Sequence, residues 1–437
     1  MKFQAPKGTR DFYPEDMAVR NWIMDAWRRT SLRNGFQEYD GPIFELLDLY
    51  RAKSGEGIVS ELFHFEDRGG RELAIRPEMT PTLARMVGAR ANSLSRPIKW
   101  FSMPRLCRAE RPQRGRLREF FQWNIDVLGV DDVIADAECV FVAIDFFREV
   151  GLTPADMVMK INSRSLLSAL LVARGFDVDR HAEIFAVLDK RDKLPEDVFA
   201  ESVQKTTRSV DEYDTLMSIA RAAGHTGLDE LAGIAAGNEA AEREMARLRE
   251  LFRLLGEMGV GEYCAFDMGV VRGLAYYTGI VFEGFGKGEL QRAICGGGRY
   301  DQLLEVLGGP PMTGVGFGTS DVVIEVVLRE LGKLPTVLAE PPQVDVYLID
   351  AAPEFFPIVL RLAGRLRQRG VRAEFSYKRQ GIGKQFKAAA AARAAKAVIV
   401  GQEFADRQVV AVKDLATGQQ VEMGVEAFVE ECGKAQT

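Results

Sequence analysis

The chain has 437 residues, of which 47% are hydrophobic and 27% are charged. This balance predicts a folded protein of two or three domains and excludes a largely disordered chain. The net charge of −6 excludes a generally basic, polyanion-binding protein, so any contact with nucleic acid must come from a local basic surface.

The five cysteines and three histidines lack the spacing of a metal site or a catalytic triad. No CxxC pair occurs, and no histidine lies within a few residues of another histidine or of a cysteine. We therefore expect reduced thiols and no tightly bound metal. No stretch approaches the ~18 uninterrupted apolar residues of a membrane span, and the first ten residues lack the apolar core of a signal peptide. These features predict a cytoplasmic protein without membrane contact.

The first part of the chain predicts a sheet with flanking helices. A helix is expected from Pro14 to the end signal at Gly35, because apolar residues recur there at helical spacing. Residues 155–256 are rich in Ala, Leu, Arg and Glu and predict helices throughout. Strands are expected at 72–75, 97–103, 119–128, 276–285 and 314–318, and helices at 81–91 and 320–331. Their hairpin-like spacing predicts an α+β domain at 1–333, an antiparallel sheet flanked by helices, with a helical insertion at about 155–260.

The last part of the chain has a different pattern. Three prolines interrupt residues 334–342, which predicts a linker. Beyond it, strands and helices alternate, with strands at 344–349, 371–376 and 397–400, a helix ending near 369 and another at 384–395. This alternation predicts a separate α/β domain at 343–437, in which helices cover a small parallel or mixed sheet.

Six arginines within fourteen residues form the first candidate site. They are Arg105, Arg108, Arg111, Arg114, Arg116 and Arg118, with Glu110 and Glu119 as the nearby acids. Guanidinium groups crowded in this way repel one another unless an anion is near, and their donor geometry matches phosphate oxygens. The alternative is a solvated hairpin loop with surface ion pairs.

The strand that follows carries polar residues on one face. Strand alternation places Gln122, Asn124 and Asp126 together, opposite a face that includes Trp123 and Ile125. A carboxylate and two amides are costly to bury without partners, so this face is expected to line a ligand site. The alternative is a face that is simply wet, as in many antiparallel sheets.

Three shorter motifs have structural explanations as well as functional ones. Glu78 and Thr80 could hold an ammonium group, but Thr80 before Pro81 also has the arrangement of a helix N-cap. Tyr276 and Tyr277 should point to opposite faces of a strand, so that one packs and the other faces the site. The three glycines of ICGGGRYD allow close backbone approach, but neither a Rossmann nor a P-loop motif occurs.

Residues 377–396 are basic and contain no acidic residue. Among them, Lys384 and Lys387 lie on the predicted helix, and Phe375, Tyr377 and Phe386 lie nearby. A phosphate backbone with stacked bases would suit this surface. A solvated helix face would explain the same charges.

Taken together, these segments resemble the class II aminoacyl-tRNA synthetases, and among them the histidyl-tRNA synthetase family. The resemblance covers nearly the whole chain. It is carried by PKGTRDFYP with GFQEYDGPIFE (first motif, dimer-forming), CRAERPQRGRLREFFQ (second motif), RGLAYYTGIVFE (the histidine-specific peptide), and GKQFKAAAAARAAKAVIVG with VKDLATGQQVE (anticodon-binding domain).

The resemblance implies activation of L-histidine by ATP with Mg²⁺, transfer to tRNA(His), and a homodimer. For the amino acid, the resemblance implies that Glu78, Thr80 and Gln122 bind it and that Asp126, Tyr276, Tyr277 and Tyr300 surround its imidazole. For ATP, it implies that Arg108 and Arg272 act at the α-phosphate and the carboxylate and that Glu110 and Arg116 bind the nucleotide. For tRNA, it implies that Gln113 approaches the acceptor end and that Lys384 and Lys387 bind the tRNA.

Two positions depart from the family pattern. Ala275 replaces an aspartate that is common there, and no arginine stands near Val323, where the family has the third-motif arginine that holds the terminal phosphate of ATP. The nearest arginine is Arg329. A rival interpretation is therefore the catalytically inactive paralogue that senses histidine and regulates histidine biosynthesis, although that paralogue usually lacks the anticodon-binding domain. A tRNA-binding protein that has lost activation is a third possibility.

Overall fold

The computed structural model describes residues 3–54, 56–224, 226–271, 276–287, 293–335, 344–378 and 380–434. The chain forms two compact units, Met1–Leu334 and Pro335–Thr437. No helix among the described residues is long and apolar enough to cross a membrane.

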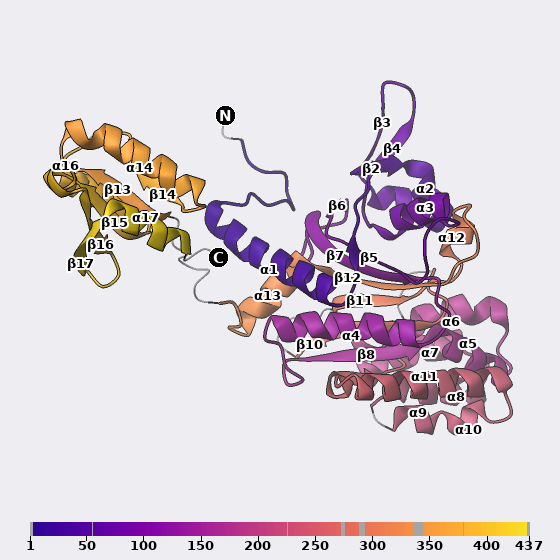
Figure 1. Ribbon diagram of the computed structural model, residues 1–437. Helices are drawn as coiled ribbons and strands as arrows, with labels where there is room; N and C mark the ends of the chain where they lie inside the picture. Colours follow the sequence, from indigo (N-terminus) through magenta and orange to yellow (C-terminus); the bar gives the residue numbers. More distant parts are fainter. Residues whose placement is uncertain are drawn as a thin grey trace. The chain divides into compact units, whose positions relative to one another are not determined.

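A mixed sheet of nine strands, counted over the described residues, is the centre of the first unit (Figure 1). The strand order is β1-β5-β7-β12-β11-β10-β8-β9, and β6 pairs with the start of β7. The pairs from β5 to β8 are antiparallel, as predicted, whereas the edge pairs β1–β5 and β8–β9 are parallel. The strands are β1 (Gln37–Glu38), β5 (Ile98–Ser102), β6 (Arg105–Cys107), β7 (Glu119–Leu128), β8 (Met157–Ser163), β9 (Cys264–Phe266), β10 (Ile280–Gly286), β11 (Ala293–Arg299) and β12 (Gly314–Ser320).

The prediction of helices throughout residues 155–256 is wrong at its start. Met157–Ser163 is strand β8, which pairs with β10 on one side and β9 on the other. Its buried Met157, Met159 and Ile161 alternate with half-buried residues, but seven residues of strand pattern were hidden in a much longer helical composition. The helices that follow are α5 (Arg164–Ala173), α6 (His181–Leu188), α7 (Glu196–Thr206), α8 (Val210–Arg221), α9 (Gly227–Glu230), α10 (Ala232–Ala235) and α11 (Glu239–Glu257).

Helices α1 (Pro14–Arg33) and α4 (Ile134–Glu149) cover the apolar face of β7. Trp27 of α1 stacks on Trp123 of β7 with ring centroids 6.2 Å apart, and Phe146 of α4 meets Trp123 edge-on at 5.3 Å. The Trp123 indole donates a hydrogen bond of 2.9 Å to the Ser31 hydroxyl, so its one polar atom is satisfied. Burial of this face leaves the polar face of β7 turned the other way.

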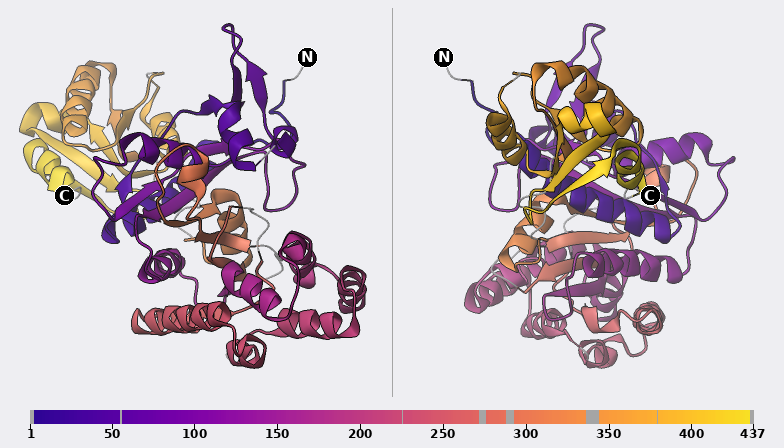
Figure 2. Two further views of the ribbon diagram at one scale, coloured as in Figure 1. Left: turned by 90° about the vertical axis from the view of Figure 1, so that its right-hand side faces the viewer. Right: turned by 60° about the vertical axis from the view of Figure 1, so that its left-hand side comes forward.

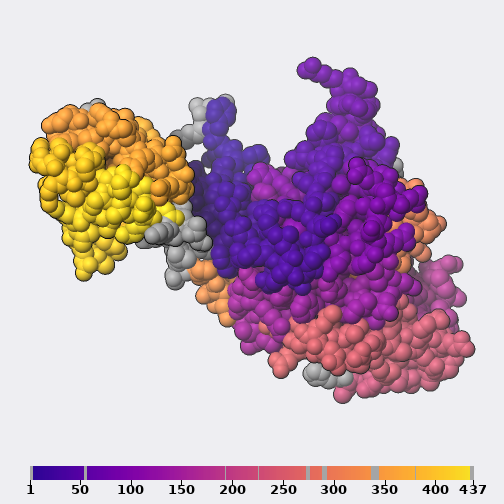
Figure 3. All heavy atoms as spheres, in the orientation of Figure 1, coloured from indigo at the N-terminus to yellow at the C-terminus, as the bar shows by residue number. Residues whose placement is uncertain are grey.

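The opposite side of the sheet carries a smaller layer (Figure 1). It contains α2 (Leu47–Ser54), α3 (Thr80–Arg90), α12 (Leu303–Val306) and a three-stranded sheet of β2 (Phe44–Leu46), β3 (His64–Glu66) and β4 (Glu72–Ile75). Leu83 and Val87 of α3 pack with Leu304 and with Ile98 of the main sheet. The β3–β4 hairpin extends away from the main sheet in every view (Figures 2 and 3). Helix α13 (Asp321–Glu330) follows β12.

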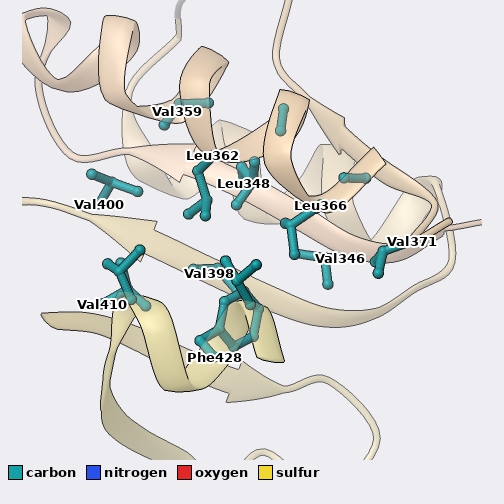
Figure 4. Close-up of a cluster of buried hydrophobic side chains, with 14 of the residues drawn as sticks. Val346, Leu348, Val359, Leu362, Leu366, Val371, Val398, Val400, Val410 and Phe428 are labelled. Carbon is teal, nitrogen blue, oxygen red and sulfur yellow. The ribbon is translucent and has the colours of Figure 1, made fainter. Parts of the chain in front are cut away.

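The second unit is a five-stranded sheet in the order β14-β13-β15-β16-β17. The first two pairs are parallel and the last two antiparallel, which confirms the predicted mixed α/β sheet. Leu362 of α14 and Phe428 of α17 pack with Leu348 and Val398 on one face (Figure 4), and Ala389 of α15 packs with Ile349 on the other. The elements are β13 (Val344–Asp350), α14 (Phe356–Gln368), β14 (Ala373–Phe375), α15 (Ile382–Ala391), β15 (Ala394–Val400), α16 (Gln402–Arg407), β16 (Val409–Asp414), β17 (Gln420–Gly424) and α17 (Val425–Lys434).

Candidate active site

A cavity of about 310 Å³ lies over the polar face of β7 in the first unit. Its walls come from segments that are far apart in the sequence: the start of α3, the loop between β6 and β7, the residues before β10, and strands β7, β11 and β12. The predicted site residues that line it are Glu78, Thr80, Arg108, Glu110, Arg116, Gln122, Asp126, Tyr276, Tyr277 and Tyr300. Asn124 and Asp126 are buried and this face of β7 is the floor of the cavity, which favours the ligand-site prediction over a face that is simply wet.

Glycines of β12 make room for the polar side chains of β7. A Cβ atom on Gly316 would lie 2.2 Å from the Asp126 Oδ1 atom, and one on Gly318 would lie 2.9 Å from the Gln122 Nε2 atom. Any larger residue would displace the carboxylate or the amide from the floor. The alternating glycines of GVGFG were the sequence signal for this arrangement, and sequence reasoning missed it.

Asp126 is a buried carboxyl group with one direct donor among the described residues. The Tyr300 hydroxyl donates a hydrogen bond of 2.5 Å to its Oδ1 atom. Burial raises the pKa of Asp126 to about 7, although the hydrogen bond from Tyr300 opposes this rise. Burial also raises the pKa of Tyr300 well above its ordinary value. At neutral pH both the protonated and the ionised form are therefore present, and either form has an oxygen atom that can accept a hydrogen bond from an N–H group of a ligand.

Tyr276 and Tyr277 line the same cavity, so the expectation that they face opposite ways is wrong. Their ring centroids are 4.8 Å apart, and the Tyr276 ring also meets the Tyr300 ring edge-on at 6.2 Å. The reason is that β10 begins only at Ile280, later than predicted, so strand alternation does not apply to the two tyrosines. Together the three rings form an aromatic wall beside Asp126.

The carboxylate of Glu78 is paired with a cation that the sequence did not reveal. The Lys53 ammonium group forms an ion pair with the Glu78 Oε1 atom and lies 4.1 Å from the centre of the Tyr276 ring. Thr80 is the first residue of α3 rather than its N-cap, which is Met79 without a side-chain hydrogen bond. The capping explanation of Thr80 is therefore wrong. Thr80 instead lines the cavity.

Arg108 is the central cation of the cavity. Its Nε atom donates a hydrogen bond of 3.0 Å to the Pro77 carbonyl, and its guanidinium group lies 5.1 Å from the centre of the Phe120 ring. Burial lowers the pKa of Arg108, while Glu78 and Glu110 favour its charged form. Arg116 is held by an ion pair with Glu110. Both arginines can bind an anion, and Arg108 would gain most because it is desolvated.

A second cavity of about 340 Å³ continues from the first. The two share Arg108, Arg116, Gln122, Gly296 and Gly318 as wall residues. At its far side the second cavity is lined by residues 293–296 of β11 and by Val322 and Val323 of α13. The first cavity is therefore polar and partly aromatic, and the second is largely apolar. The two arginines lie where the cavities meet.

The other arginines of the cluster do not line either cavity. Arg105 forms an ion pair of 3.0 Å with Glu119, and Arg114 pairs with Glu330 of α13. The Arg118 Nε atom donates a hydrogen bond of 3.0 Å to the Glu110 carbonyl. Of the arginine cluster, only Arg108 and Arg116 therefore remain candidates for binding phosphate. Arg105 and Arg114 form ion pairs instead, as the explanation of a solvated surface loop expects.

The remaining predicted residues lie elsewhere. Gln113 is exposed at the bend of the β6–β7 loop, and Lys384 and Lys387 are exposed on α15 of the second unit. Arg272 lies outside the described residues, as does Ala275. Arg329 pairs with Glu325 on α13, and the arginines that line the cavities within the described chain are Arg108 and Arg116 alone.

No group of three or more His, Cys, Asp or Glu side chains in the described part of the chain could hold a metal ion. Carboxylate and arginine groups gathered around one hollow are instead suited to a ligand that carries ammonium, heterocyclic N–H and phosphate groups.

Comparisons of the sequence and of the structure with known proteins all find the same family. A family profile described as histidyl-tRNA synthetase matches residues 8–321, and one described as anticodon binding domain matches residues 343–434. A chloroplastic/mitochondrial histidine–tRNA ligase of Arabidopsis thaliana is 39% identical over 418 residues, covering 96% of this chain and 84% of its own length. A histidine–tRNA ligase of Opitutus terrae is 39% identical over 423 residues, covering 95% and 94%. The crystal structure of histidyl-tRNA synthetase from Nostoc sp. PCC 7120 has a TM-score of 0.85 at 25% identity, with 100% of both chains covered.

Proposed function

Because the chain belongs to the histidyl-tRNA synthetase family, we propose that its two connected cavities bind L-histidine and ATP and join them as histidyl-adenylate. The family membership makes the chain an aminoacyl-tRNA synthetase, a ligase for histidine and tRNA. One observation carries the assignment of the site: Glu78, Arg108 and Asp126 line a single hollow although they come from three distant segments.

We propose that the first cavity holds the amino acid. Glu78 and Thr80, with Gln122, would bind its α-ammonium group, and Asp126 would accept a hydrogen bond from the imidazole. The aromatic wall of Tyr276, Tyr277 and Tyr300 would enclose the ring. The buried Asp126–Tyr300 pair supports the proposal. A substrate without a ring N–H group would leave the buried Asp126 without a hydrogen bond from the ligand, so the site would discriminate against it.

ATP with Mg²⁺ is proposed as the second substrate, with the nucleotide in the second cavity. Arg116 and Glu110 would contact ATP, and Arg108 would hold the α-phosphate. Arg272, which lies outside the described residues, would act as the second cation there. The desolvated Arg108 guanidinium at the junction of the two cavities fits a phosphate group. The Mg²⁺ ion would come bound to the phosphates, as part of the substrate.

The proposed chemistry needs no protein nucleophile. A carboxylate oxygen of histidine attacks the α-phosphorus, the bond from that phosphorus to the bridging oxygen of the β-phosphate breaks, and pyrophosphate leaves with the electron pair. Negative charge grows on the α-phosphate oxygens in the transition state, so fixed guanidinium donors lower the barrier. The terminal ribose hydroxyl of tRNA(His) then attacks the activated carbonyl, and AMP leaves.

The tRNA is proposed to contact both units. Gln113 in the exposed β6–β7 loop would approach the acceptor end. Lys384 and Lys387 of α15 would contact the phosphate backbone, and their exposure on one helix face supports this role. The match of residues 343–434 to an anticodon binding domain also supports a contact with tRNA.

A homodimer is also proposed, through the small three-stranded sheet of the first unit. Large apolar side chains are exposed there: Ile43, Phe44, Leu46, Phe63 and Phe65. The Phe44 and Phe65 rings meet edge-on, with centroids 6.2 Å apart, and exposed apolar groups gathered in this way are typical of a protein–protein interface. A cytoplasmic location is proposed as well, supported by five free cysteines.

The histidine-sensing paralogue is not favoured as an alternative. The missing third-motif arginine near Val323 favours it. However, the chain carries an anticodon binding domain, and its relatives at 39% identity over nearly the full length are histidine–tRNA ligases.

Histidine-dependent exchange of pyrophosphate into ATP tests the proposal. The purified chain should exchange label only when L-histidine is present, and should charge tRNA(His) when that tRNA is added. Omission of Mg²⁺ should abolish both activities. Binding of histidine without any exchange would overturn the proposed activation reaction and make the sensor the better interpretation.

A further inference from the structure

Lys53 is a buried cation to which the proposed reaction gives no role. It lies in the last turn of α2, and its side chain is only 2% exposed. Burial lowers the pKa of Lys53, whereas the adjacent Glu78 carboxylate favours the charged form. A buried ammonium group is costly unless it is paired, so the position of Lys53 is tied to its partners.

The partners of Lys53 are two wall residues of the amino-acid cavity. Its ammonium group pairs with the Glu78 Oε1 atom and lies 4.1 Å from the centre of the Tyr276 ring. Glu78 and Tyr276 both line the cavity, whereas Lys53 does not. The lysine therefore contacts two residues of the wall without lining the cavity itself.

This arrangement determines which part of Glu78 a ligand can reach. A carboxylate has two oxygen atoms with about four acceptor positions. The ion pair with Lys53 uses the Oε1 atom, so a ligand in the cavity would meet the remaining acceptor positions. Among the described residues, Arg108 is another cation whose charge interacts with that of Glu78. Without Lys53, Glu78 would be drawn toward Arg108, the cation that the proposed reaction needs for phosphate.

We infer that Lys53 is a positioning residue for the amino-acid substrate, which fixes the Glu78 carboxylate toward the substrate ammonium group and seats the Tyr276 ring beside the substrate side chain. This inference rests on the proposed function of the cavity. Lys53 acts through Glu78 and Tyr276 and does not itself contact the substrate.

Lys53→Met is the direct test, because methionine keeps the length of the side chain and removes its charge. In pyrophosphate exchange, the KM for histidine should rise at least ten-fold, while the KM for ATP stays within two-fold of wild type. Lys53→Arg, which restores a cation, should bring the histidine KM back to within about three-fold. Equal rises in both KM values, or an unchanged histidine KM, would overturn the inference.

A double-mutant cycle separates positioning through Glu78 from general loss of structure. In a Glu78→Gln background, Lys53→Met should change the histidine KM less than two-fold, because the carboxylate that it positions is gone. A full ten-fold effect in both backgrounds would contradict action through Glu78.

Lys333→Met is the matched control. Lys333 also pairs with a carboxylate, at 3.4 Å from Asp156, but it lies outside both cavities. Its removal should leave both KM values unchanged. If Lys53→Met does not fold, as judged by its melting transition, Lys53→Gln replaces it, and a wild-type histidine KM in that variant would overturn the inference.

Failure of the inference is distinguishable from failure of the proposed function. Wild-type protein without histidine-dependent exchange would refute the proposed function. Normal exchange in wild type, together with an unaffected histidine KM in the Lys53 variants, would refute the role of Lys53 alone.

Discussion

Burial shifts the pKa values of two cavity residues, Asp126 and Arg108, and of the neighbouring Lys53 toward the neutral form. Burial raises the pKa of Asp126 and lowers those of Lys53 and Arg108. Each shift records a cost of holding the charged form out of water. A ligand that brings the opposite charge or a matching hydrogen bond gains more at such groups than it would in water, since the surroundings screen poorly. The cavity is thus prepared for a ligand with both positive and negative groups.

Asp126→Asn should make the protein more stable, and more so at pH 8 than at pH 5. The pKa of Asp126 in the folded protein is about 7, against an ordinary value of 3.8. Ionisation of this group costs the folded protein more than the unfolded chain. As far as this group is concerned, the free energy of unfolding is therefore highest below pH 3.8 and falls as the pH rises through 7. Because asparagine does not titrate, its advantage over aspartate should grow by about 2.6 kcal/mol between pH 5 and pH 8. Chemical denaturation at both pH values measures it.

The same substitution should weaken histidine binding, since a charged acceptor contributes more to a buried hydrogen bond than an amide does. A rise of the histidine KM at pH 8 with an unchanged ATP KM is expected. A stability difference between the two proteins that does not depend on pH would contradict the raised pKa.

Residues of the site differed in how well the sequence revealed them. Arg108 stands in a family-specific motif, and Glu78 and Asp126 stand in local patterns that the sequence shows directly, a carboxylate next to a helix start and the polar face of a strand. Lys53 could not be found in this way, because its partner Glu78 is 25 residues away and a lone lysine in an amphipathic helix has an ordinary surface explanation. Only packing shows that its side chain is buried.

At the scale of elements, the pairing of β7 with β12 creates the floor of the cavity. Gly316 pairs with Asp126 and Gly318 with Asn124 in the antiparallel register. The bare backbone of β12 is what allows the side chains of β7 to lie across it. The polar face of β7 was predictable from alternation, whereas the partner strand that accommodates it was not.

Gly316→Ala should therefore damage both stability and histidine binding. The new Cβ atom would lie 2.2 Å from the Asp126 Oδ1 atom and 2.5 Å from the Ile125 carbonyl oxygen, so the strands would have to separate. Overpacking of this kind costs about 1–3 kcal/mol. Urea unfolding and the histidine KM measure the two effects.

Gly256→Ala, in the exposed last turns of α11, is the control. A Cβ atom there meets nothing within 4 Å, so alanine should be neutral or stabilising by up to about 1 kcal/mol. If Gly316→Ala were tolerated as well as Gly256→Ala, the close approach of β7 and β12 would be wrong.

At the scale of the whole molecule, two differently built units divide the proposed work. The first contains the cavities, and the second presents the basic face of α15. Amino-acid activation should depend on the first unit, whereas tRNA charging should depend on both.

Charge reversal of Lys384 and Lys387 to glutamate should separate the two activities. Removal of two cations from a phosphate-binding surface, with addition of two negative charges, should weaken tRNA binding and raise the tRNA KM by about ten-fold or more at physiological salt. Pyrophosphate exchange, which needs no tRNA, should stay within two-fold of wild type.

Reversal of Arg361 and Arg369 provides the matched control. Both are exposed on or directly after α14, which covers the opposite face of the same sheet. Their reversal changes the net charge by the same amount but should leave tRNA charging nearly unchanged. Equal losses in both variants would indicate a general charge effect rather than a contact through α15.

The sequence by itself determined the family, the two building styles of the chain and most of the residues around the cavity, because these are recorded in local motifs and in periodicities of two or 3.6 residues. Only the tertiary structure decided that β8 joins the sheet, that Tyr276 and Tyr277 face the same way, and that Lys53 lies behind Glu78. The physical reason is that strand partners, the start of a strand and the burial of a charge depend on contacts between residues far apart in the chain. No local pattern specifies such contacts.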